Sequence, residues 1–218
     1  SASTTTPTPT TTTTAPRSTA AKSLASARVL SAETRAIIAR HTGMDYETSA
    51  DLPADELRLL GCADLRDVSA LDTVQRLDLT QCTQLEDVSA LGWGMVRHLV
   101  LCDCIRVRDV SMLGGMETLN LSGCIGVGDV SALGGVRTLI LSGCMLVRDV
   151  SALGRVQQLN LSGCAQVADV SALGGVPELD LWACCGVSDF SAVPHARGLP
   201  RAPSSSSSTK RGGDCVLM

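Results

Sequence analysis

The stretch Val136-Arg-Thr-Leu-Ile-Leu-Ser-Gly-Cys-Met-Leu-Val-Arg-Asp-Val-Ser-Ala-Leu153 contains the pattern that decides the fold. Its Leu-x-Leu part has a period of two, so both leucines point to one side of an extended chain and the residue between them to the other. The Asp-Val-Ser-Ala-Leu part then leads the chain back, as a return arc, toward the start of the next strand. A segment this short cannot bury its own apolar side, so it needs similar neighbours.

Such neighbours are present, because the pattern recurs through residues 54–193. Its aspartate recurs every 20 residues, except for one spacing of 22 caused by two extra residues around Trp93-Gly94-Met95. The aspartates are Asp67, Asp87, Asp109, Asp129, Asp149, Asp169 and Asp189. Cysteines recur in step, at Cys62, Cys82, Cys104, Cys124, Cys144, Cys164 and Cys184. The tandem repeat predicts a solenoid in which each repeat gives one strand to a parallel sheet.

The pattern Leu-x-x-Leu-x-Leu-x-x-Cys-x-x-Val-x-Asp resembles that of the leucine-rich-repeat family. Its Cys-x-x-Val-x-Asp part is similar to the cysteine-containing class, and its Asp-Val-Ser-Ala-Leu part is similar to the short repeats of bacterial internalins and many protozoan proteins. The resemblance covers roughly two thirds of the chain. It implies an α/β solenoid with a curved parallel sheet and short convex arcs of turns or 3-10 segments. Because the family binds many unrelated partners, usually on the concave face, it implies no particular activity.

The composition divides the chain into four regions. Residues 1–22 are a Thr/Pro-rich tail that we expect to be disordered. Residues 23–53 form a predicted helical cap, with a helix over 23–41 between Ser23 and Gly43; a transit peptide is the alternative reading. The repeats at 54–193 precede a flexible, Ser-rich, basic tail at 194–218, and Pro194–Pro200 looks like a poor cap that leaves an edge open to dimerisation. The first residue is not Met, which suggests a processed or partial chain.

The charge and composition exclude several functions. A net charge of −4 argues against a generally basic nucleic-acid binder. Only three His are present, and we see no nucleophile–base pair, phosphate loop or metal cluster, so we expect no enzymatic activity and no cofactor. No apolar run approaches the roughly 18 residues that a membrane-spanning helix needs.

The two repeated polar columns have structural interpretations. We expect the column cysteines to be buried thiols that hydrogen-bond weakly to the backbone of the next turn, because no Cys-x-x-Cys pair is present. Cys102, at an outward position, is expected to be an exposed free thiol. Each column aspartate is expected to cap its own tight turn; calcium is the alternative, but the Gly-Gly-x-Gly-x-Asp repeats of calcium-binding rolls are absent.

The concave face is the candidate partner-binding surface. Its small, uncharged middle lies between charged ends. Trp182 is expected either to anchor a partner or to help cap the last repeat, and His98 to be a solvated face residue and not a catalytic base. The candidate binding residues are Arg76, Asp78, His98, Val100, Asn120, Ile140, Asn160, Asp180 and Trp182.

The ending Cys215-Val-Leu-Met218 has the C-a-a-X form, and Met at its last position points to farnesylation of Cys215 by a prenyltransferase. The Ser204–Ser208 run makes the end accessible, and Lys210 and Arg211 add a small basic patch. A single lipid chain holds a protein on a membrane only marginally, so a second signal is required. The expected location is therefore the cytoplasmic side of a membrane in a eukaryotic cell, where the cysteines stay reduced.

Two alternative functions remain at this point. Residues 51–57 faintly resemble the opening of an F-box, the helical motif of ubiquitin-ligase adaptors, although the repeat register leaves no room for the rest of the box. The Thr-rich tail would alternatively suit a glycosylated stalk on a secreted or surface recognition protein.

Overall fold

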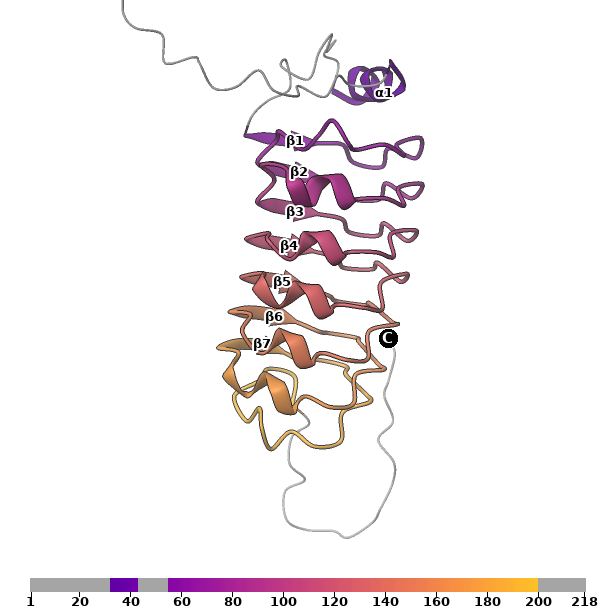
Figure 1. Ribbon diagram of the computed structural model, residues 1–218. Helices are drawn as coiled ribbons and strands as arrows, with labels where there is room; N and C mark the ends of the chain where they lie inside the picture. Colours follow the sequence, from indigo (N-terminus) through magenta and orange to yellow (C-terminus); the bar gives the residue numbers. More distant parts are fainter. Residues whose placement is uncertain (1–31, 43–54, 200–218) are drawn as a thin grey trace, which may run out of the picture.

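The computed structural model describes residues 32–42 and 55–199 (Figure 1). Over these residues it contains one α-helix, α1 (Ala32–Thr42), and a parallel sheet in which strand order follows chain order. Among these residues the strands are β1 (Glu56–Arg58), β2 (Arg76–Asp78), β3 (His98–Val100), β4 (Thr118–Asn120), β5 (Thr138–Ile140), β6 (Gln158–Asn160) and β7 (Glu178–Asp180). Figure 1 shows the strands stacked along one side of the molecule and the loops along the other.

Equivalent residues of successive repeats pair with each other in the sheet. Leu119, for example, pairs with Leu139, and Leu139 with Leu159. Each of these central leucines is buried, and so is the leucine two residues further on, because both point away from solvent into the space between the sheet and the return arc. The fold is therefore the leucine-rich-repeat solenoid that the sequence predicts.

The return arcs contain short 3-10 helices, as expected. They are η2 (Ser89–Trp93), η3 (Ser111–Leu113), η4 (Ser131–Gly135), η5 (Ser151–Leu153) and η6 (Ser171–Gly175). Each begins at the serine of Asp-Val-Ser and buries one leucine, such as Leu133 of η4. A 20-residue repeat must also contain the strand and its turns, so its arc holds little more than one turn of 3-10 helix. Such a turn spans the arc in few residues because a 3-10 helix advances about 2 Å per residue.

The glycines after this leucine are needed for close packing between repeats. A Cβ on Gly134 would lie 2.4 Å from the carbonyl oxygen of Ala152, and one on Gly154 would lie 2.4 Å from that of Ala172. Left-handed backbone occurs elsewhere, in the Ser-Gly-Cys segment, where Gly143 has φ +73. At the equivalent position of the last repeat Ala183 has φ 57. The structure thus gives close approach, and not freedom of the turn, as the reason for the first glycine of each pair.

The N-terminal edge of the sheet is covered by α1. Ile37 and Ile38 are buried in the same core as the repeat leucines. Arg40 of α1 forms an ion pair with Asp64 of the first repeat, with 3.1 Å between nitrogen and oxygen. Residues 23–31 and 43–53 of the predicted cap lie outside the described residues, so the cap and the transit-peptide alternative stay predictions.

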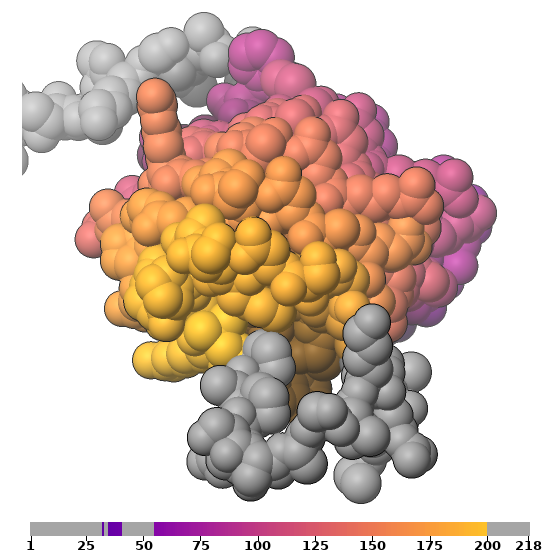
Figure 2. Space-filling view, turned by 90° about the horizontal axis from the view of Figure 1, so that it is seen from below, coloured from indigo at the N-terminus to yellow at the C-terminus, as the bar shows by residue number. Residues whose placement is uncertain are grey.

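The C-terminal edge is better covered than the sequence suggested. The Arg197 amide donates to the carbonyl of Leu179 at 2.7 Å, and the Leu181 amide donates to the carbonyl of Arg197 at 3.0 Å. Val193 and Ala196 are buried, since they continue the apolar columns of the previous repeat. Figure 2, viewed from this end, shows the yellow segment after β7 lying over the orange residues of the last repeats. The expectation of a poor cap is wrong for this part of the edge.

Candidate functional site

The cysteine column lies entirely in the core. The thiol of Cys144 donates to the carbonyl of Leu121 at 3.1 Å, and that of Cys124 to the carbonyl of Leu101 at 2.9 Å. The same bond occurs at Cys82, Cys104, Cys164 and Cys184. The acceptor belongs to the preceding repeat, so the predicted direction, toward the next turn, is wrong. The reason is that each leucine carbonyl, which already accepts the amide of its own repeat's cysteine, points toward the following repeat.

Burial makes these thiols resistant to ionisation. Desolvation raises the pKa of Cys82, Cys104, Cys124, Cys144 and Cys164 to about 12, and that of Cys184 to about 11. A neutral, buried thiol is neither a good nucleophile nor a good metal ligand. Among the described residues no group of three or more His, Cys, Asp or Glu side chains is placed to hold a metal ion.

The aspartate column lies at the surface and shapes the start of each return arc. Asp149 Oδ1 accepts the backbone N–H of Ser151 at 2.9 Å. The same Asx-turn is present at all seven aspartates, as predicted. The hydrogen bonds from the serine backbone, and then from its side chain, lower the pKa of Asp87, Asp109, Asp129, Asp149, Asp169 and Asp189.

The candidate binding residues lie together on the outward side of the sheet, which we call the sheet face. Arg76 and Trp182 are exposed, whereas Asp78, His98, Val100, Asn120, Ile140, Asn160 and Asp180 are half-buried. Four of them also have a structural role that sequence reasoning missed. The side-chain oxygens of Asp78, Asn120, Asn160 and Asp180 each accept the backbone N–H two residues later, at 2.8 to 3.0 Å. The available signal was Asp or Asn at the central position of Leu-x-Leu, because these side chains bond to the backbone two residues later.

Three individual predictions on this face can be compared with the structure. Trp182 is 63% exposed, so its indole is available to a partner, while the backbone of Arg197 and Gly198 covers the edge. Cys102 is free but half-buried and not exposed as expected, and its pKa is raised, mainly by burial. His98 Nε2 lies 3.9 Å from Glu117 Oε2 at the surface, which suits a solvated residue.

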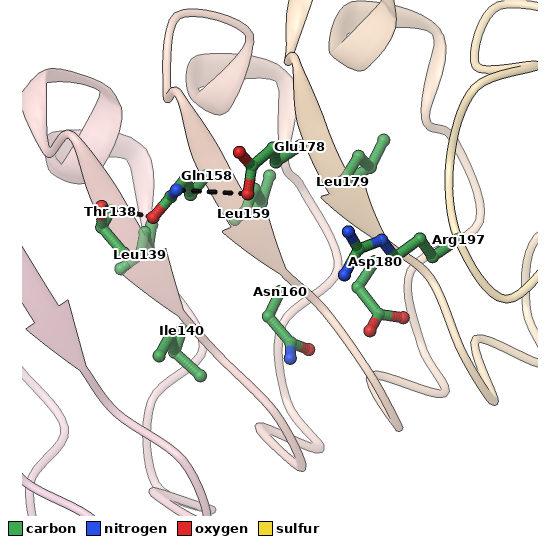
Figure 3. Close-up of a pocket in the computed structure, with 10 residues that line it drawn as sticks. All are labelled: Thr138, Leu139, Ile140, Gln158, Leu159, Asn160, Glu178, Leu179, Asp180 and Arg197. Atoms are coloured by element: carbon green, nitrogen blue, oxygen red, sulfur yellow. Dashed lines mark hydrogen bonds between the residues drawn. The ribbon is translucent and has the colours of Figure 1, made fainter.

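A hollow of about 190 Å³ lies on the sheet face across β5, β6 and β7 (Figure 3). Thr138 Oγ1 donates to Gln158 Oε1 at 3.0 Å, and Gln158 Nε2 donates to Glu178 Oε2 at 3.1 Å. Ile140, Asn160 and Asp180 form a second row, and Arg197 extends to it from the segment after β7. Sequence reasoning assigned Arg197 to the tail. The 20-residue register does not place it here, because Arg197 pairs with Asp180, only 17 residues before it in the chain.

The two other sequence motifs, the F-box resemblance and the C-a-a-X ending, lie partly or wholly outside the described residues. Glu56 and Leu57, the end of the F-box resemblance, lie in strand β1 and not in a helix, which argues against that motif. Cys215, the predicted lipid site, lies outside the described residues. Within the described part of the chain, no helix has the length and apolar character to span a membrane.

No protein-family model and no curated protein sequence matches this chain. Among solved structures, internalin C2 of Listeria monocytogenes is similar with a TM-score of 0.47 and 19% identity, over 75% of this chain and 88% of that one. Internalin F of the same organism has a TM-score of 0.43 and 15% identity, over 72% and 67%. The functional domain of InlJ from L. monocytogenes, which includes a cysteine ladder, has a TM-score of 0.31 and 18% identity, over 65% and 40%. The fold assignment rests on the repeat and the sheet topology of this chain itself.

Proposed function

We propose that this protein is a non-catalytic scaffold that binds a protein partner on its sheet face. The observation that carries this proposal is the difference between the two polar columns of the repeat and its sheet face. The column thiols are buried and neutral, and the column aspartates are engaged in turns, so neither is placed for chemistry. The sheet face, in contrast, offers a row of amide, hydroxyl and charged side chains, with an exposed Trp182 at one end. Aromatic residues of this kind are favoured anchors in protein interfaces.

Site-specific cross-linking in the cell of origin tests this proposal. A photo-reactive amino acid replaces Thr138 on the sheet face in one variant and Ser131 on the return arc in a matched one. Both residues are at least partly accessible to solvent. We expect a discrete cross-linked partner from position 138 and none from position 131. Equal cross-linking at positions 138 and 131 would overturn the proposal. So would the absence of cross-linking both at position 138 and at a second sheet-face position, Gln158.

The finer part of the proposal is that Cys215 is farnesylated and tethers the scaffold to the cytoplasmic side of a membrane. It is supported by the sequence Cys215-Val-Leu-Met218 and by the Ser-rich, basic stretch before it. The thiolate of Cys215 would displace diphosphate from farnesyl diphosphate to form a thioether, catalysed by a prenyltransferase. Because one lipid is a weak anchor, the bound partner would supply the second membrane signal.

Mass spectrometry of the C-terminal peptide from the native cell tests the lipid directly, with Cys215→Ser as the control. We expect a farnesyl-sized increment on Cys215 and loss of residues 216–218. An unmodified peptide that ends at Met218 would remove membrane tethering but leave the scaffold proposal standing.

A further inference from the structure

Charge is balanced along most of the sheet face but not at its C-terminal end. In the first repeat Glu56 is paired with Arg58 at 2.6 Å. In the second, Asp78 lies on the same short strand as Arg76. The middle strands, β4 to β6, carry no charge at their outward positions. Strand β7 carries both Glu178 and Asp180, and Arg197 is the single cation that lines the hollow beside them.

The hydrogen bonds of the hollow leave both carboxylates available. Glu178 accepts one hydrogen bond, from the Gln158 amide, and Asp180 accepts one, from the Trp182 backbone N–H. Among the described residues the second oxygen of each carboxylate has no partner, and the Arg197 guanidinium forms no ion pair. Residues two apart on a strand face the same side, so both carboxylates face the same hollow.

Hydrogen bonds also fix the orientation of the Gln158 side-chain amide. Gln158 accepts from Thr138 and donates to Glu178, so this chain of bonds points its donors toward the carboxylate end of the hollow. Ile140 adds an apolar wall suited to the methylene stem of a long side chain. A hollow with an apolar wall and two carboxylates complements a cationic side chain.

We propose that this hollow binds the guanidinium or ammonium group of an arginine or lysine side chain presented by the protein partner. This inference rests on the proposed function and adds the chemistry of the partner's contact. The remaining negative charge selects the cation, and the apolar wall covers its methylene stem. Trp182, which is exposed, lies two residues beyond Asp180 in the chain. A guanidinium, which can bond two carboxylate oxygens at once, suits the site better than an ammonium.

Peptide binding to the full-length chain tests this inference. The probes are capped pentapeptides of sequence Gly-Leu-X-Leu-Gly in which X is Arg, Gln or Glu. Binding is followed by the fluorescence of Trp182 in a Trp93→Phe background, because the chain contains two tryptophans. We expect the Arg peptide to bind at least ~10-fold more tightly than the Gln peptide at low salt, and the difference to shrink as salt is added.

The repeats themselves provide matched variants. Glu178→Gln with Asp180→Asn converts the outward pair of β7 to the Gln and Asn that already stand at 158 and 160, so folding and the Asx-turn are retained. Glu56→Gln with Asp78→Asn removes two charges from the other end of the same face. We expect the first pair to abolish the preference for Arg and the second to leave it unchanged.

Four results would overturn the inference. They are equal binding of the Arg and Gln peptides, tighter binding of the Glu peptide, equal losses in the two double variants, and a tenfold gain in Arg-peptide affinity on replacing Lys210 and Arg211 with Gln. The last would assign the hollow to this chain's own tail. If the sheet face cross-links a partner but the peptides show no preference, the scaffold proposal stands and this inference fails. If the Arg peptide is preferred but no partner is cross-linked, the hollow selects a cation, and the scaffold proposal and its partner fail.

Discussion

The column cysteines and the column aspartates recur with the same period, but the first lie in the core and the second in solvent. A column thiol reaches the preceding repeat, as Cys144 reaches Leu121. A column aspartate reaches only the serine two residues later, as Asp149 reaches Ser151. The cysteines therefore couple neighbouring repeats, whereas the aspartates shape each repeat separately. Equal repetition in a sequence thus says nothing about which column holds the stack together.

The largest expected effect that separates the columns is alkaline unfolding. Burial raises the pKa of five column thiols from 9.0 to about 12, so folding keeps them neutral where an unfolded chain would release their protons. This stability is fully present below pH 9 and is lost as the pH rises toward 12. Residues 54–193 contain no Lys and no Tyr, so few other groups titrate in this range. Urea unfolding under reducing conditions should show the free energy falling steeply from pH 9.

A control isolates the thiols. In a Cys124→Ala, Cys144→Ala double variant the decline of unfolding free energy with pH should be shallower, although the protein is less stable at pH 7. The same slope as in the parent chain would show that the thiols do not cause the alkaline loss.

The next largest effect comes from exchanging the side chains of the two columns. Cys144→Asp places a carboxylate among buried leucines, beside the carbonyl of Leu121, and should cost about 3 kcal/mol or more. The reverse exchange, Asp149→Cys, puts a small side chain in solvent and loses only one Asx-turn. Urea denaturation monitored by circular dichroism should rank the two far apart. Similar losses would mean that the columns are energetically alike.

A smaller effect measures one turn. Asp87→Ala removes the acceptor that binds the Ser89 N–H at 2.9 Å, and we expect a loss of about 1 kcal/mol, comparable to that of a helix N-cap. Asp87→Asn keeps a side-chain oxygen in place and should lie closer to the parent chain. The thermal midpoints of the three proteins decide the matter, and an Asn variant as unstable as the Ala variant would exclude the Asx-turn as the cause.

The smallest effect is expected in acid. Hydrogen bonds from serine lower the pKa of the column aspartates below 3.8, so their contribution is present above pH 4 and is lost as the pH falls through the lowered pKa values. Changing Asp109, Asp129 and Asp149 together to Asn should flatten the unfolding free energy between pH 4 and pH 2. Because these side chains are fully exposed, salt and water weaken the effect.

The sheet and its arcs could be predicted from the sequence because the residues that specify each strand and each turn lie within a single repeat. The period-two leucines specify a strand, and the Asp-Val-Ser-Ala-Leu segment specifies the turn that follows. The outward positions, including Asn120, Ile140 and Asn160, follow from the same alternation. These features depend on a few neighbouring residues, repeated, and so can be read from the linear order.

Only the tertiary structure decided what depends on the spacing between repeats. The direction of the thiol bonds, the need for Gly134 to clear the carbonyl of Ala152, and the position of Arg197 in the hollow each involve atoms about 20 residues apart. Such contacts follow from how closely successive turns stack and from where the last segment pairs. The sequence determined the repeat, and the stacking of the repeats determined which side chains meet.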